Sequence, residues 1–278
     1  MTRHPPGRTA RRAAIGTLVG LAAAGVLAPW LAPFDPVAQP DILAGAGRPP
    51  HWPHVLGTDA YSRDVLSRLL HGTRVSLGLG LAAGGLAAAL GTLVGLASGA
   101  SPRWLDGMLM RGVDTAVAIP RVVVLATAVA IWGALPAPLL VLLMAATGWF
   151  GIARLVRTEV RALRGTEWMT AAVAQGVPPW RRWWHHLLPA VWPTIGVAAT
   201  LAVAQTIALE AAVSFLGIGV RPPQSSRGTL LAEAADHPWR WWWLAAAPGA
   251  TLVATLLACN ALADGLRERH RPGEVASP

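Results

Sequence analysis

Long stretches without a charged side chain are the feature that most limits how this chain can fold. Residues 13–34, 75–102 and 122–153 carry no Asp, Glu, Lys or Arg, and the shortest of them has 22 residues. About 20 mostly apolar residues in a helix cross the ~30 Å hydrocarbon core of a bilayer. Only 13% of the 278 residues are charged, against about 25% in a soluble domain. The sequence therefore predicts an all-α, polytopic membrane protein.

The stretch at 122–153 is too long for one span, and Gly133, Pro136 and Pro138 interrupt it near its centre. Glu210 is the only charge in 187–220. A cleaved signal peptide is an alternative for the first stretch, but that run is long for one, which favours a retained anchor. About six transmembrane helices are expected: one ending near Trp30, then 75–102, 112–133, 138–158, 187–220 and 241–263.

Glycines recur every fourth residue inside the second predicted span, at Gly80 and Gly84 and again at Gly91, Gly95 and Gly99. Small residues at this spacing allow two helix backbones to approach closely in a membrane. The alternative is chance, because the chain is rich in glycine and alanine. The spacing predicts close helix packing along 75–102.

Arginine placement predicts the orientation, since cytoplasmic loops carry an excess of Lys and Arg. The chain has no lysine, and 15 of its 23 basic residues fall in segments that are internal if the N-terminus is cytoplasmic, against seven in external segments. Both termini are therefore expected in the cytoplasm. The predicted organisation is a tail and first helix at 1–34, an extracytoplasmic segment at 35–73, a membrane core at 74–265 containing a cytoplasmic loop at 159–185, and a cytoplasmic tail at 266–278.

The loop at 159–185 is the longest predicted inner connection. Thr166 can cap a helix that begins at Glu167, whose negative charge suits the positive end of the helix dipole. Gly176 is a plausible stop for this helix. Its small residues Ala171 and Ala172 would allow close docking into a groove of another protein. An ordinary interfacial loop is the alternative.

The stretch TAAVAQGVPPWRRWWHHLLP at 170–189 resembles the coupling-loop signature of bacterial ABC importer permeases. That signature is Glu-Ala-Ala, three residues, Gly, nine residues, a hydrophobic residue, one more residue, and Leu-Pro. Thr170 stands where the family usually has Glu, and His186 stands at the hydrophobic position. The matching residues are Ala171, Ala172, Gly176, Leu188 and Pro189.

Three further stretches resemble the peptide and nickel branch of that family, closest to its second, C-type permease subunit. They are LGTDAYSRDVLSRLLHGTRVSL at 56–77, LEAAVSFLGIGVRPP at 209–223 and NALADGLRERHRP at 260–272. Ser62 and Ala263 replace usual glycines, and Arg227 replaces a usual Trp. The residues that carry these motifs are Gly57, Thr58, Asp59, Arg63, Asp64, Ser214, Phe215, Leu216, Gly217, Asn260 and Asp264.

The resemblance implies a type I ABC importer permease in the bacterial cytoplasmic (inner) membrane. Such a chain forms half of a pore with a second homologous permease, above two ATPase subunits and below an extracytoplasmic solute-binding protein. The cargo of such systems is a peptide or a related small solute such as nickel or a metal chelate. The resemblance places Thr170, Ala171, Ala172 and Gly176 in the coupling helix that the ATPase grips.

No cofactor is expected on this chain. It has no Gly-x-x-x-x-Gly-Lys-Ser/Thr phosphate loop and no lysine to build one, so ATP and Mg are expected on the partner ATPase subunits. No metal site is expected either: there is no His-Glu-x-x-His motif, and Cys259 is the only cysteine.

Three charges within the predicted spans have alternative roles. Glu210 falls about 30 Å along its helix from Ala190, near the outer boundary, where it caps a turn or bonds across subunits, or else acts in gating or substrate contact. Asp114 is expected to pair with Arg111. Arg121 either snorkels to the inner interface or faces the pore and meets a substrate carboxylate.

Two other function classes compete with a permease subunit. An intramembrane enzyme lacks support, because Ser214 has no Gly-x-Ser-x-Gly setting. A secondary carrier that works without ATP would favour internal repeats and charged or broken helices at the midplane, whereas this sequence shows no clear repeat and few charges near the midplane. The spans exclude a nucleic-acid binder.

Overall fold

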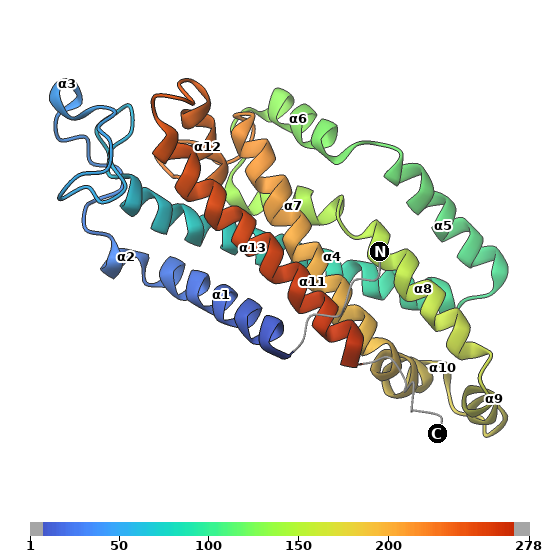
Figure 1. Ribbon diagram of the computed structural model, residues 1–278. Coiled ribbons are helices and arrows are strands. Elements are labelled where there is room, and N and C mark those ends of the chain that lie inside the picture. Colours follow the sequence, from blue (N-terminus) through green and yellow to red (C-terminus); the bar gives the residue numbers. More distant parts are fainter. Residues whose placement is uncertain (1–7, 270–278) are drawn as a thin grey trace.

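The computed structural model describes residues 8–269 as helices joined by loops (Figure 1). Residues 1–7 and 270–278, which hold parts of the two predicted tails, lie outside the described residues. Within 8–269 no strand is formed, and Thr58 and Asp64 make an isolated β-bridge. This confirms the all-α class. The elements are α1 Arg8–Val26, α2 Ala28–Leu31, α3 Ile42–Gly45, α4 Val65–Ala100, α5 Arg103–Val117, α6 Arg121–Trp132, α7 Ala137–Ala146, α8 Phe150–Arg164, α9 Glu167–Ala174, α10 Pro179–Arg182, the π-helix η1 Trp183–Leu187, α11 Leu188–Phe215, α12 Arg227–Ala235 and α13 Trp242–Arg269.

The long helices run side by side, with α3 and α12 at one end of the molecule and α9 and α10 at the other (Figure 1). Helix α4 is the centre of the packing and contacts α1, α7, α8 and α11. It begins at Val65, inside the predicted extracytoplasmic segment 35–73. Arg68 does not end the helix, because its guanidinium is buried against carboxylates rather than left in lipid.

The glycines of α4 bring its backbone against two neighbouring helices, as their spacing predicts. A Cβ atom added at Gly95 would lie 2.7 Å from the carbonyl oxygen of Ala153 and 2.7 Å from Cβ of Val156, both on α8. A Cβ at Gly84 would lie 2.7 Å from Cα of Val203 on α11. In a membrane such close packing replaces the hydrophobic effect as the force that associates helices. The prediction of close helix approach is confirmed.

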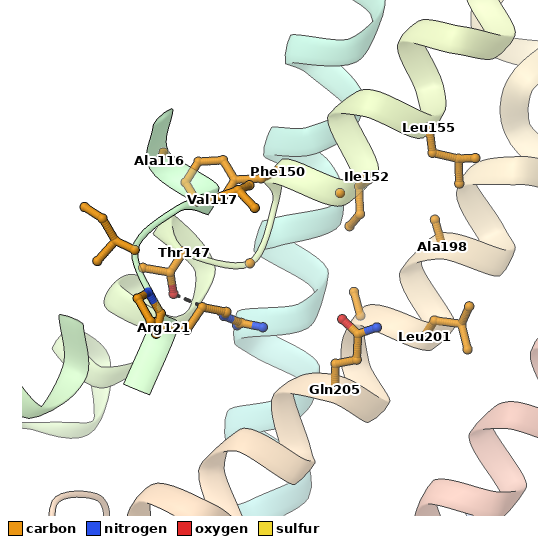
Figure 2. Close-up of a pocket in the computed structure, with 15 residues that line it drawn as sticks. Ala116, Val117, Arg121, Thr147, Phe150, Ile152, Leu155, Ala198, Leu201 and Gln205 are labelled. Atoms are coloured by element: carbon orange, nitrogen blue, oxygen red, sulfur yellow. Dashed lines mark hydrogen bonds between the residues drawn. The ribbon is translucent and has the colours of Figure 1, made fainter. Parts of the chain in front are cut away.

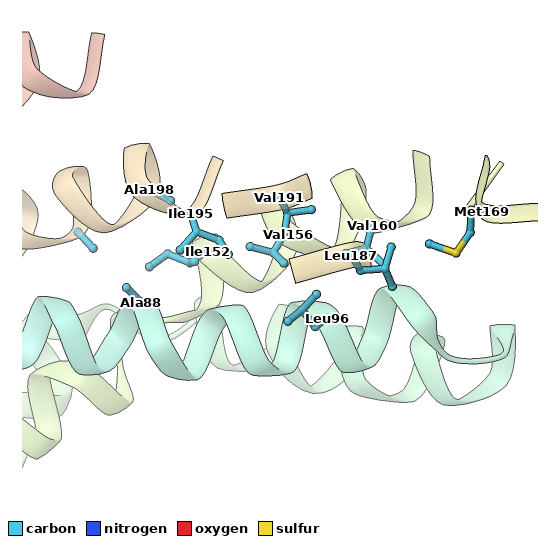
Figure 3. Close-up of a cluster of buried hydrophobic side chains, with 11 residues drawn as sticks. Ala88, Leu96, Ile152, Val156, Val160, Met169, Leu187, Val191, Ile195 and Ala198 are labelled. Carbon is cyan, nitrogen blue, oxygen red and sulfur yellow. The ribbon is translucent and has the colours of Figure 1, made fainter. Parts of the chain in front are cut away.

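A cluster of buried apolar side chains joins α4, α8, α9 and α11 toward the α9 end (Figure 3). Leu96 of α4 lies against Val156 and Val160 of α8, with Leu187 and Val191 completing the layer. Val156, Val160 and Val191 have no exposed surface. This cluster joins α4, α8 and α11 into one unit at the end of the molecule where α9 lies.

Two predicted spans are wrong as continuous helices. The predicted helix 112–133 is broken between α5 and α6, which meet at 71°, and the predicted helix 138–158 is broken between α7 and α8, which meet at 42°. Pro120 explains the first break, because it has no N–H to donate and disfavours helical backbone at the residue before it. At the second break Gly148 follows the last turn of α7, and α8 begins at Phe150.

Among residues 8–269, three helices are long and apolar enough to span a membrane, α4, α10–α11 taken together, and α13. The number rises to five if each bent pair counts as one span. Helix α1, the predicted first span, is not among them and packs against α4 and α13. The count of six and the side on which the termini lie therefore stay predictions.

Candidate functional site

The short helix predicted in the inner loop is α9, and its ends follow local sequence rules. It begins at Glu167 after Thr166, although the Thr166 hydroxyl donates to the Leu163 carbonyl and makes no side-chain cap. At the other end Gly176 has φ +72°. The N–H of Val177 donates to the Ala172 carbonyl at 3.1 Å, which together with the Gly176 conformation forms a Schellman motif. Only glycine takes this conformation without strain, so the predicted stop at Gly176 is confirmed.

The two alanines of α9 lie on different sides of the helix. Ala172 is buried with Met169 against the rest of the chain, whereas Ala171 is exposed. The expectation that both line one docking surface is wrong, because adjacent residues of a helix lie about 100° apart. Thr170 is exposed and donates back to the Thr166 carbonyl at 3.0 Å. The exposed face of α9 consists of Thr170, Ala171, Val173, Ala174 and, just beyond the helix, Gln175 and Gly176.

Helix α8, which leads into α9, is joined to α4 and α5 by an ion cluster that the sequence pattern did not reveal. Asp106 of α5 is 2% exposed. It accepts from Arg157 at 2.5 and 2.7 Å, from Arg161 at 2.5 Å and from the Ser98 hydroxyl at 2.5 Å. Arg164 donates to two carbonyl oxygens at the C-terminus of α4, at 3.0 Å each. These contacts join α8 to both α4 and α5.

Asp114 and Arg121 are placed differently from the expectation. Asp114 pairs with Arg154 of α8 at 2.6 Å rather than with Arg111, because the α5–α8 contact brings that guanidinium closer. Arg121 is the first residue of α6, after the break, rather than a residue deep in a continuous span. Its Nη2 donates to the Met144 carbonyl at 3.1 Å and its Nε donates to the Thr147 hydroxyl at 3.4 Å.

Arg121 lines a cavity of about 400 Å³ between the two helix breaks and the middle of α11 (Figure 2). The guanidinium extends toward the side chain of Gln205 on the opposite wall. The rest of the lining is mostly apolar, with Phe150, Leu155 and Leu201 among its larger side chains. Helix breaks within a membrane occur where backbone lines a cavity, so the two breaks and the cavity are one feature.

Glu210 is fully buried and is connected through Ser214 to the turn that follows α11. Its Oε1 accepts from the Ser214 hydroxyl at 2.8 Å, and Ser214 Oγ accepts from the Val220 N–H at 3.1 Å. Arg227 of α12 is also buried and donates from Nη1 to the Thr255 hydroxyl of α13 at 2.6 Å. Oε2 of Glu210 and two nitrogens of Arg227 have no hydrogen-bond partner among the described residues.

The motif residues at 56–77 build a buried ion network at the α3 end. Asp59 accepts from Arg63 at 2.6 Å and also from Arg68, and both arginines donate to Glu233 of α12. Asp64 caps α4 by accepting from the Ser67 N–H at 2.7 Å. The network joins the start of α4 to α12.

Three other positions of the 56–77 motif are explained by a local hydrogen bond or by backbone conformation. Thr58 donates to the Gly45 carbonyl at 2.6 Å. Gly57 has φ +75° and Ser62 has φ +63°. The conformation of Ser62 explains the usual glycine there, because a left-handed φ strains other residues.

The remaining motif residues lie elsewhere. Gly217 has φ +76° and ends α11, after the exposed side chains of Phe215 and Leu216. Asn260 and Asp264 are exposed on α13, where Asn260 donates to the Leu256 carbonyl and Asp264 faces Arg267 at 3.9 Å. The structure therefore does not bring the four motifs together into one site.

Residues 91–273 match the family described as the binding-protein-dependent transport system inner membrane component. The chain is 36% identical over 255 residues to the di/tripeptide transport system permease protein DppC of Pseudomonas aeruginosa, covering 89% of this chain and 82% of that protein.

Two proteins of Brucella suis show the same degree of similarity. One, assigned as a peptide transport system permease, is 36% identical over 247 residues, covering 88% of this chain and 81% of the relative. The other, assigned as a peptide permease, is 36% identical over 254 residues, covering 87% and 80%. The helices long enough to span a membrane and the match over 91–273 together show that this multi-pass membrane protein belongs to the family of inner-membrane components of binding-protein-dependent transport systems.

Proposed function

We propose that this chain is a permease subunit of an ATP-driven peptide importer, and that α9 is the helix through which separate ATPase subunits act on it. The family supports the transport role, and the names of the relatives support peptides as the cargo class. The chain forms half of the pore, and a second permease forms the other half. ATP and Mg are held by the two ATPase subunits, and an extracytoplasmic binding protein delivers the peptide.

The observation that carries this proposal is how α9 is held. The side of α9 that faces the rest of the chain is buried through Met169 and Ala172. Trp168 stacks on His186 of η1 with ring centroids 6.3 Å apart. No other described helix covers its exposed face. A small, smooth surface that is fixed from behind is suited to enter a groove of another protein.

The contacts of α8 provide a route for movement from α9 into the membrane. A push on α9 moves the end of α8, and the Asp106 cluster transfers that movement to α5 while Arg164 transfers it to α4. Helix α5 leads to the break at Pro120, beside the cavity. Closure of an ATPase dimer would thus alter the cavity by rigid movement of packed helices.

The test is a large side chain on the exposed face of α9. The complete importer is reconstituted in proteoliposomes, and uptake of a labelled tripeptide and ATP hydrolysis are measured together. We expect Ala171→Trp to abolish uptake and to remove the stimulation of ATP hydrolysis by the binding protein, because the added ring prevents docking.

Ala171→Ser is the matched control, since it keeps a small side chain at the same position and should retain uptake. Normal uptake by Ala171→Trp at normal expression would contradict the coupling role of α9. Absence of ATP-dependent tripeptide uptake by the unmodified importer would contradict the peptide assignment.

A further inference from the structure

We infer that the cavity at Arg121 is a binding site for the C-terminal carboxylate of the peptide in transit. This inference rests on the proposed function and adds a recognition site within the permease itself. Its basis is a cationic side chain that faces an otherwise uncharged cavity between the two broken helix pairs (Figure 2). The volume of about 400 Å³ falls within the range of ligand sites.

The position of Arg121 is unfavourable unless the charge has a purpose. It is the first residue of α6, at the positive end of the helix dipole, where a cation is disfavoured. Ionisable side chains inside membrane segments are costly and usually functional. The bond to the Met144 carbonyl at the end of α7 could be made by a neutral donor, and the Thr147 hydroxyl already donates to the Leu143 carbonyl at 2.9 Å. Structural capping therefore does not require a full charge.

The donors of Arg121 leave room for a ligand. A guanidinium has five N–H groups, and within the described chain two of them have acceptors, one on Nε and one on Nη2. The other N–H groups have none, and none of the residues that line the cavity is acidic. A carboxylate accepts two parallel bonds from a guanidinium, so a free peptide C-terminus matches both the charge and the geometry.

Two neighbours shape the site. Gly148 leaves the space that the guanidinium occupies, since a Cβ there would lie 3.0 Å from Arg121 Nη2. Gln205 places an uncharged amide on the opposite wall, and an amide both donates to and accepts from peptide groups. The apolar lining around them accepts side chains without selecting one. The site would bind the C-terminal carboxylate of the peptide and accept different side chains on the peptide.

The test uses the assembled importer in lipid nanodiscs and a thiol placed in the cavity. Leu155 lines the cavity and is 43% exposed, and the only native cysteine, Cys259, is buried. In a Leu155→Cys background, the rate of alkylation by a small maleimide is measured against the concentration of trialanine or of trialanine amide. We expect trialanine to protect the thiol at a concentration roughly ten-fold lower than the amide, as loss of a charge-assisted hydrogen bond predicts.

Arg121→Gln should remove this preference, and Arg121→Lys should retain part of it, because lysine keeps the charge but not the paired donors. Arg111→Gln is the matched control, an exposed arginine of α5 outside the cavity, and should keep the ten-fold preference. If Arg121→Gln does not assemble, the comparison of Arg121→Lys with the unmodified residue decides.

Equal protection by the acid and the amide would overturn the inference, as would an unchanged preference in the Arg121 variants. A thiol that resists the maleimide without peptide would show that the partner permease fills the cavity, and this too would overturn it. ATP-dependent uptake of trialanine by the unmodified importer is measured separately, so failure of the carboxylate site is distinguishable from failure of the peptide-importer assignment.

Discussion

The packing of α4 against α8 gives a prediction with a magnitude that the structure supplies. Gly95→Ala would place Cβ at 2.7 Å from both the Ala153 carbonyl and Val156 Cβ, whereas ordinary contact begins at 3.4 Å. The two backbones must therefore separate by about 0.7 Å, and overpacking of this kind costs about 1–3 kcal/mol. The same substitution also gains about 0.5–1 kcal/mol from the higher helix propensity of alanine, so an absolute change would be hard to interpret.

Gly85→Ala removes that ambiguity. Gly85 lies in the same helix, and a Cβ there meets nothing within 4 Å. The propensity gain is common to both variants and cancels in their difference. We expect Gly95→Ala to have a free energy of unfolding about 1–3 kcal/mol lower than that of Gly85→Ala.

The assay is equilibrium unfolding of the purified chain in mixed detergent micelles. Tryptophan fluorescence can follow it, since the chain has 14 Trp residues. Equal free energies of unfolding for the two variants would refute the close approach of α4 and α8. A lower value for Gly85→Ala would show that the packed face of α4 has been assigned to the wrong side.

Three further outcomes are expected. Gly176→Val should lower tripeptide uptake and reduce the free energy of unfolding by about 1–2 kcal/mol, because φ +72° is strained for a branched residue. Unchanged uptake would show that the glycine at the end of α9 is not needed for coupling to the ATPase. Asp106→Asn should leave ATP hydrolysis unchanged and lower uptake several-fold, since Arg157 and Arg161 lose the negative charge and one acceptor oxygen of the carboxylate that they share; a simultaneous uptake and hydrolysis assay checks this. Arg227→Met should destabilise the protein more than Arg227→Met combined with Glu210→Gln, because the single change leaves a buried carboxylate without its nearby cation; a thermal unfolding series that shows additive losses would contradict this.

Much of the fold follows from where charges are missing. In lipid every backbone N–H and C=O must be bonded, and an α-helix bonds them all within one continuous segment, so long uncharged stretches predict helices. The helices α4, α11 and α13 follow from this rule. The rule does not give exact ends: α4 begins at Val65, where Asp64 caps it, and includes Arg68 because that side chain pairs with carboxylates, one of them on α12.

Local geometry also made the end of α9 predictable, since a glycine followed by prolines is a strong stop for a helix. The orientation of its alanines was not predictable in this way. Which of Ala171 and Ala172 is buried depends on how α9 packs, and Met169 of α9 belongs to a buried cluster that includes side chains of α4 and α11, far away in the sequence.

The sequence by itself determined that this chain is a helical membrane protein, with a loop that contains a short helix and with motifs that resemble those of ABC importer permeases. These conclusions rest on composition, charge spacing and local turn residues, which act over a few positions of the chain. Only the tertiary structure decided that two spans are broken, that Asp106 joins α8 to α5, and that Arg121 faces a cavity shared with Gln205. The physical reason is separation: Asp106 and Arg157 are 51 residues apart, so their pairing depends on how whole helices pack.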